Sequence, residues 1–269
     1  MPSRRAVADE THVEHVRSFD GTRIAYAVQG TGPAVLLLHG FAADHVLNWA
    51  RPGVIDALTA AGRRVIATDA RGHGASDKPH DPDRYAGDAM ARDAQVVLDH
   101  LGVEEVDVVG YSMGAMVAAR LVPVEPRTRT LVLGGVGATV APPRTGGRAP
   151  EAIAVALLAD DPSSIENASG KAFRQFADAT GADRQALAAL SRSSALRFEV
   201  RFDAITVPTL VVVGADDTLI RSPGELADRL PSARLVTVAG DHLGAPYDPA
   251  FARAIVDFLD QARKQRLTR

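Results

Sequence analysis

The chain has 269 residues, a formal net charge of −3 and no cysteine. This length is enough for one large α/β domain that buries a sizeable core. The weak charge gives no indication of binding to nucleic acid or to an anionic membrane surface, and the absence of cysteine excludes disulfides, thiolate metal sites and a cysteine nucleophile.

The first ten residues predict a flexible N-terminal tail at 1–10. They contain Arg4 and Arg5 but no apolar run behind them, which argues against a signal peptide or a membrane anchor. No stretch of the sequence approaches the roughly 20 apolar residues that span a bilayer. We therefore expect a cytoplasmic protein without membrane contact.

The next segments predict strands. Residues 12–19 and 22–28 form a candidate hairpin, because Asp20-Gly21 between them is a strong turn dipeptide. Short uninterrupted apolar runs then recur along the chain, as is typical of strands covered on both faces. These runs are 34–38, 64–68, 106–109, 130–133, 210–213 and 234–238.

Helical patterns alternate with these strands. Segment 87–101 carries its apolar residues on one face and ends at Gly102. Segment 222–225 has the S-x-x-E pattern of a capping box, and Asp248-Pro249 begins a last helix. The expected inner face of that helix is Phe251, Ile255, Phe258 and Leu259. The alternation predicts a doubly wound, mostly parallel sheet of about eight strands with an antiparallel start.

The segment between Gly135 and Val207 has no strand pattern. It begins with a loop rich in Pro and Gly at 141–147. Three helical patterns follow, at 151–158, 171–180 and 183–190. A crossover needs only one helix, so we expect a helical cap over the carboxyl edge of the sheet rather than ordinary crossover helices. The predicted organisation is the tail at 1–10, an α/β core at 11–138 and 204–269, and the cap at 139–203.

Gly110-Tyr111-Ser112-Met113-Gly114 is the most informative motif of the chain. It lies between a predicted strand and the apolar helical run 115–119, which is the context of a nucleophile elbow. The serine occupies a strained turn there, and the glycines let strand and helix approach closely. Ser112 is therefore the candidate nucleophile; the alternative is a small-residue turn at the edge of a core.

A serine nucleophile needs a base within hydrogen-bond reach and an acid that orients the base. His242 follows the last predicted strand and is the only histidine after residue 100, so it is the candidate base. Asp216 and Asp217 follow the preceding strand, and only one of them can reach the imidazole. Asp241 competes, but it would have to fold back onto its neighbour. We rank Asp217 first and Asp216 second.

A tetrahedral intermediate also needs hydrogen-bond donors for its oxyanion. In a sheet of this architecture, one backbone N–H comes from the residue after the nucleophile and the other from the loop after the third strand. The candidate donors are the amides of Met113 and of Phe41, the latter within His39-Gly40-Phe41.

Together these motifs resemble those of α/β-hydrolase-fold serine hydrolases over nearly the whole chain. The resemblance rests on segments 39–41, 69–76, 110–114, 207–217 and 240–242. It implies an acid three residues after the glycine that ends its strand, which again selects Asp217. It also implies that His39, His73 and the rest of segment 69–76 shape turns around the site.

The resemblance also implies a chemistry. Epoxide hydrolases and haloalkane dehalogenases of this fold use an aspartate where Ser112 stands, and the single glycine after His39 argues against a hormone-sensitive-lipase type. We expect hydrolysis of carboxylic esters, thioesters or lactones through an acyl-enzyme, without a cofactor. The candidate substrate-binding residues are apolar, which favours small to medium, largely apolar acyl groups. They are Phe41, Trp49, Phe173 and Phe176.

Other functions stay open. The same triad serves C–C bond hydrolases and cofactor-free perhydrolases or haloperoxidases, and some proteins of this fold are ligand-binding signal receptors. A C–C hydrolase would hold a carboxylate with a buried cation, for which Arg184, Arg192 and Arg197 are candidates.

We expect no metal site. The histidines at 12, 15 and 45 have no carboxylate partners at ligand spacing. The expected partner is a small-molecule substrate, and no pattern indicates an oligomeric state.

Overall fold

The computed structural model describes residues 12–138, 148–195 and 201–268. The predicted tail at 1–10 and the loop at 141–147 lie outside these ranges. In the three described ranges, no helix combines the length and the apolar character needed to cross a bilayer.

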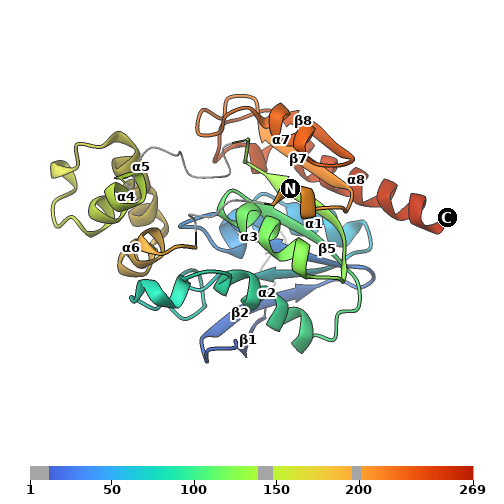
Figure 1. Ribbon diagram of the computed structural model, residues 1–269, viewed down its shortest axis with the longest axis horizontal. Helices are drawn as coiled ribbons and strands as arrows, with labels where there is room; N and C mark the ends of the chain where they lie inside the picture. The colour runs from blue at the N-terminus through green and yellow to red at the C-terminus, as the bar shows by residue number, and fades with distance from the viewer. Residues whose placement is uncertain (1–11, 139–147, 196–200, 269) are drawn as a thin grey trace, which may run out of the picture.

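Within the described residues, eight strands form one sheet, as the sequence predicts (Figure 1). They are β1 (Val13–Arg17), β2 (Arg23–Gln29), β3 (Ala34–Leu38), β4 (Arg64–Thr68), β5 (Val106–Tyr111), β6 (Thr128–Gly134), β7 (Thr209–Gly214) and β8 (Ala233–Val238). Their order is β1-β2-β4-β3-β5-β6-β7-β8. Strand β2 is antiparallel to β1 and β4, and the other pairs are parallel. The predicted fold class is therefore confirmed.

Helices cover both faces of the sheet. They are α1 (Val54–Ala60), α2 (Ala89–His100), α3 (Met113–Leu121), α7 (Pro223–Arg229) and α8 (Pro249–Leu267). Helices α2, α3 and α7 pack against one face, and α1 and α8 pack against the other. The predicted inner face of α8 is confirmed, because all four of its side chains are buried.

The central strands are apolar throughout because both of their faces are covered. In β3, Leu36 and Leu38 belong to the core under α2 and α3, whereas Val35 and Leu37 belong to the core under α1 and α8. An uninterrupted apolar run is the sequence pattern that this arrangement requires.

The capping box predicted at 222–225 is not formed. Helix α7 begins at Pro223, but Ser222 has a φ of 50° and its hydroxyl makes no capping hydrogen bond. A side chain caps a helix from an extended backbone, as Asp248 does when it accepts from the Ala250 amide at 2.9 Å. The left-handed backbone of Ser222 lacks this geometry.

Three further helices lie together at one side of the sheet (Figure 1). They are α4 (Arg148–Leu158), α5 (Ala168–Thr180) and α6 (Arg184–Arg192). They share a small core that includes Ala154, Leu157, Ala177 and Leu187. In the described part of the segment between Gly135 and Val207 there is no strand, in agreement with the sequence pattern. Short helical turns complete the described elements, at Val46–Ala50, Pro82–Tyr85, Val122–Val124, Pro162–Ser164, Phe202–Ala204 and Ala245–Tyr247.

The strand order reverses at β3. The chain leaves β3 for β4 on one side and returns to β5 on the other side. The loops that follow β3 and β5 therefore leave the carboxyl edge of the sheet next to each other, which is where doubly wound sheets bind ligands. Residues 39–41 follow β3, and Ser112 follows β5.

A buried arginine connects the β1–β2 turn to α2. The Arg71 guanidinium donates to the two Asp93 carboxylate oxygens at 2.7 and 2.6 Å and to Asp20 Oδ2 at 2.9 Å. The side chains of Arg71 and Asp93 are 0% and 5% exposed. The pair therefore holds two charges away from water, and each compensates the other.

We predict that Asp93→Ala lowers the free energy of unfolding by about 3–5 kcal/mol, because Arg71 would stay buried without its main partner. Urea unfolding at neutral pH measures this change. The matched control is Asp99→Ala on the same helix, where a carboxylate 66% exposed contacts Arg127 at 2.7 Å. The control should change stability by less than about 1 kcal/mol. If both variants changed the free energy of unfolding by equally small amounts, the buried pair of Arg71 and Asp93 would not have the stabilising role that we assign to it.

Candidate active site

Ser112 lies in a strained turn between β5 and α3. Its φ and ψ are 52° and −114°, values that residues other than glycine rarely adopt. The turn is possible because Gly110 and Gly114 have no side chains: a Cβ on Gly114 would overlap the carbonyl oxygen of Leu38, and one on Gly110 would overlap that of Gly114. This is the geometry that the nucleophile elbow predicts.

Three side chains from different strand ends form one hydrogen-bonded chain. His242 Nε2 lies 2.9 Å from Ser112 Oγ, and His242 Nδ1 lies 2.6 Å from Asp217 Oδ2. The Asp217 side chain is fully buried, and the His242 side chain is 15% exposed. A carboxylate can only accept, so Nδ1 carries the proton and Nε2 is free to accept from the serine hydroxyl. The predicted residues are thus brought together in the order that nucleophilic catalysis needs.

The three candidate acids have different surroundings. Asp217 accepts from the His242 ring and, through Oδ1, from the Leu219 amide at 3.0 Å. Asp216 is exposed. Asp241 Oδ1 accepts from the amides of the two residues at 243 and 244, at 3.1 and 2.7 Å, and so closes its own turn. Among these carboxylates, Asp217 contacts the imidazole.

The loop after β3 passes next to the elbow. A Cβ on Gly40 would lie 3.5 Å from Ser112 Cβ. Within the described residues, nothing accepts a hydrogen bond from the amides of Phe41 and Met113. The two amides that the sequence predicts as oxyanion donors are therefore not used by another acceptor in the described part of the chain.

Two buried side chains hold this loop. His39 Nδ1 lies 2.7 Å from the Gly40 carbonyl oxygen, and its Nε2 accepts from the Ala70 amide at 3.0 Å. Burial lowers the pKa of His39, so the ring is neutral and can accept. Asn48 Oδ1 accepts from the Gly40 amide at 2.7 Å. Sequence reasoning missed Asn48, because its polar side chain lies in a short apolar turn with no pattern that indicates its partner.

His73 and His45 are also buried. Burial and the nearby His39 lower the pKa of His73 to about 3, and its ring packs 5.1 Å from that of His39. His45 Nδ1 contacts Asp69 Oδ1 at 2.8 Å, a carboxylate partner that the sequence spacing did not indicate. The described residues contain no group of three or more His, Cys, Asp or Glu that could hold a metal ion.

Comparisons with known proteins support the fold. A family model described as alpha/beta hydrolase fold matches residues 33–133, which include the elbow. A solved hydrolase from Pseudomonas aeruginosa superimposes with a TM-score of 0.75 at 29% identity, over 93% of this chain and 99% of that chain. The chain is an α/β-hydrolase-fold protein. An esterase from Exiguobacterium antarcticum also shares the fold, with a TM-score of 0.73 at 24% identity over 91% of this chain and 98% of that chain.

Curated relatives of this α/β-hydrolase-fold protein match over a shorter segment. Epoxide hydrolase 3 of Siraitia grosvenorii is 38% identical over 107 residues, which are 39% of this chain and 33% of that protein. The chain thus spans about a third of the length of the curated relatives that it matches.

Only some of the predicted substrate-binding residues of this protein lie close to one another. The Phe41 ring packs edge-to-face against Phe173 at 5.5 Å, and Phe41 and Phe176 are both half-buried against the small core of α4–α6. Trp49 is not part of this group. It is fully buried in the core under α1 and α8, with its ring 6.4 Å from that of Tyr111. Its assignment as a pocket residue is corrected, because the turn Val46–Ala50 directs the indole into the core.

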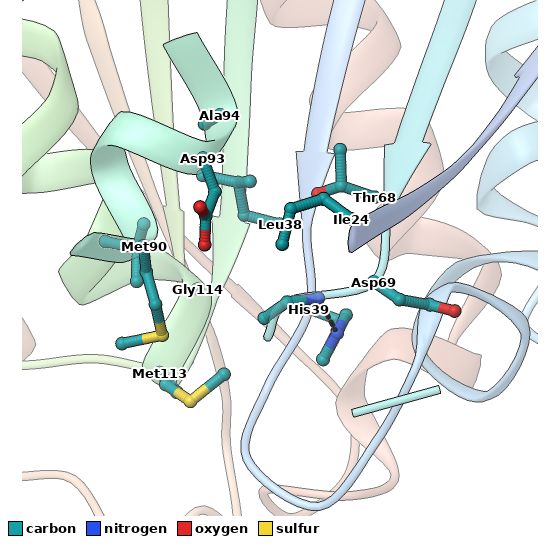
Figure 2. A pocket seen from close by; sticks show the side chains of 12 residues that line it. Ile24, Leu38, His39, Thr68, Asp69, Met90, Asp93, Ala94, Met113 and Gly114 are labelled. Atoms are coloured by element: carbon teal, nitrogen blue, oxygen red, sulfur yellow. Dashed lines mark hydrogen bonds between the residues drawn. The ribbon is translucent and has the colours of Figure 1, made fainter. Parts of the chain in front are cut away.

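A small cavity lies beside the turn that carries Ser112 (Figure 2). Its volume is about 20 Å³, and Met90, Met113, Gly114 and His39 are among its lining residues. This is the space of about one water molecule, too small for a substrate. Asp69 also lines it, but Figure 2 shows the Asp69 carboxylate directed away from His39.

Neither of the two described candidate cations for a carboxylate, Arg184 and Arg192, is buried. Arg192 contacts Glu151 at 2.9 Å, and Arg184 lies 3.8 Å from Asp178. Both arginine side chains are about 40% exposed, at 39% and 41%. Arg197 lies outside the described residues.

Proposed function

We propose that this α/β-hydrolase-fold protein is a serine hydrolase that cleaves small to medium, largely apolar carboxylic esters, or related thioesters and lactones. The observation that carries the proposal is the hydrogen-bonded chain from Ser112 through His242 to Asp217. A serine aligned with an oriented imidazole next to two backbone amides is suited to acyl transfer.

The proposed reaction has two halves. Ser112 Oγ attacks the carbonyl carbon while His242 Nε2 takes the hydroxyl proton, and the amides of Phe41 and Met113 hold the oxyanion. The intermediate then expels the alcohol, which leaves with the proton from His242. Water attacks the acyl-enzyme while His242 takes a proton from it. The bond between the acyl carbon and Ser112 Oγ then breaks, Ser112 Oγ takes the proton back from His242, and the carboxylic acid is released. Asp217 stabilises the imidazolium throughout.

We also propose that the segment 139–203, with α4–α6, is a cap over the site. The support is the contact between Phe41, next to the nucleophile, and Phe173 of α5. Ala42 of the same loop packs into the small core of these helices. The cap would supply an apolar wall for the acyl group through Phe173 and Phe176.

The alternatives receive less support. Epoxide opening is not proposed, because Ser112 stands where the resemblance implies an aspartate in epoxide hydrolases. C–C bond hydrolysis is disfavoured by the exposure and pairing of Arg184 and Arg192. Perhydrolases use the same triad and signal receptors of this fold can retain it, and no contact in the described residues favours either function.

Steady hydrolysis of nitrophenyl acetate and butyrate is the expected result for the wild-type protein, with a lower kcat/KM for the octanoate. The reason is the proposed apolar wall beside Ser112, where the contact between Phe41 and Phe173 would limit the length of the acyl chain. Initial rates with the three esters, corrected for spontaneous hydrolysis, measure this preference. A single burst without turnover would contradict the hydrolase proposal and favour a ligand-binding protein.

A further inference from the structure

Tyr111 is the last residue of β5 and directly precedes the nucleophile. Its hydroxyl donates to the backbone carbonyl of His242 at 2.6 Å. Its ring also lies against the His242 imidazole, with the ring centroids 5.4 Å apart and the planes tilted by 43°. Tyr111 therefore contacts the proposed base at two points, the main chain and the side chain.

The Tyr111 ring is itself held tightly. It is 3% exposed, and the rings of Trp49 and Phe251 pack against it nearly edge-on at 6.4 and 5.7 Å. On another side it touches the main chain at the end of β6: a Cβ on Gly134 would lie 2.7 Å from Tyr111 Cδ2, and one on Gly135 would lie 2.8 Å from Cζ. The ring can occupy this place only because both residues are glycine.

The phenol is a permanent donor. Burial, with a smaller contribution from the charges of Asp217 and Asp241, raises the pKa of Tyr111 well above its usual value. The hydroxyl therefore stays protonated wherever the protein is folded near neutral pH, and its hydrogen bond to the His242 carbonyl persists.

The loop that carries His242 lies at the edge of the sheet, where few neighbouring elements hold it in place. It follows β8, the edge strand of the sheet, and Leu243 next to the histidine is 53% exposed. Small displacements of a catalytic group reduce rates strongly, by about 100-fold for about 1 Å. We infer that Tyr111 is a positioning residue, which fixes the His242 main chain and imidazole so that Nε2 stays within reach of Ser112 Oγ. This inference rests on the proposed serine hydrolase function.

Tyr111→Phe tests the hydroxyl. We expect kcat for nitrophenyl butyrate to fall about tenfold, with KM changed less than about twofold, because one hydrogen bond to the base segment is lost. The matched control is Tyr85→Phe, which also removes a buried phenol whose hydroxyl donates to a backbone carbonyl, that of Pro79 at 2.6 Å. The two variants should melt at similar temperatures, and the control should keep the wild-type kcat. A folded Tyr111→Phe with the wild-type kcat would overturn the inference.

A second readout is independent of any substrate. We expect the proton between His242 Nδ1 and Asp217 Oδ2, which are 2.6 Å apart, to give a low-field signal in the proton NMR spectrum of the wild-type protein. This signal should shift or broaden in Tyr111→Phe but not in Tyr85→Phe. If the wild-type protein hydrolyses no ester, the proposed function fails while this spectrum still tests the positioning. An unchanged signal in Tyr111→Phe would refute it.

Gly134→Ala provides a test that keeps the phenol. The added methyl group would lie 2.7 Å from the Tyr111 ring, which must move, and no positive φ adds backbone strain at this position. We expect the same loss of kcat and the same change in the low-field signal. This variant decides the question if Tyr111→Phe does not fold, and a wild-type kcat in folded Gly134→Ala would overturn the inference.

Discussion

Ser112→Ala is expected to lower kcat for nitrophenyl esters by about 10⁶-fold and to leave the melting temperature nearly unchanged. The rate falls because no oxygen nucleophile remains for His242 to activate; loss of the serine in comparable triads costs about this much. Stability changes little, because alanine keeps the strained backbone at a φ of 52° and only the hydrogen bond to His242 is lost. Steady-state rates and a thermal melt of the same preparation measure both quantities.

The control for Ser112→Ala is Ser232→Ala. Ser232 also has a positive φ, of 61°, but it precedes β8 at the opposite end of that strand from His242. It should keep the wild-type kcat. If Ser112→Ala hydrolysed esters as fast as the control, the assignment of the nucleophile would be wrong.

Asp217→Asn is expected to lower kcat by about 10⁴-fold, with a much smaller change in KM. An asparagine amide facing Nδ1 favours the imidazole tautomer that carries its proton on Nε2, which cannot accept from Ser112. The imidazolium formed during the reaction also loses its counter-charge. Rates measured between about pH 7 and 8 with nitrophenyl butyrate test this effect.

Asp216→Asn is the matched control for this prediction. It makes the same chemical change one residue earlier in the loop, on a side chain that is exposed rather than buried against His242. It should retain nearly full activity. The opposite pattern, with the large loss in Asp216→Asn, would reassign the acid.

The order and type of most elements were predictable because a buried strand leaves a continuous apolar pattern. Strands β3 and β4 have the bounds that their apolar runs predict, and the turn at Asp20-Gly21 joins the antiparallel pair. The prediction was weaker where the pattern is short. Helix α1 spans seven residues, Val54–Ala60, and was not anticipated. The prediction of a capping box at Ser222 was wrong, because a four-residue motif does not determine the backbone angle of its first residue.

For the candidate site, the sequence by itself determined which residues could act and at which strand ends they lie. Ser112 was identifiable because it lies in a G-x-S-x-G motif between a strand and a helix. His242 was identifiable because it follows a strand and is the only histidine after residue 100. The sequence ranked Asp217 ahead of Asp216, and the tertiary structure shows that Asp217 is the carboxylate that contacts the imidazole. The tertiary structure alone decided that Trp49 faces the core, whereas Asn48 and Tyr111 support the site. The physical reason is that periodicity encodes the burial of local segments, whereas the direction of a loop side chain depends on packing between residues far apart in the chain.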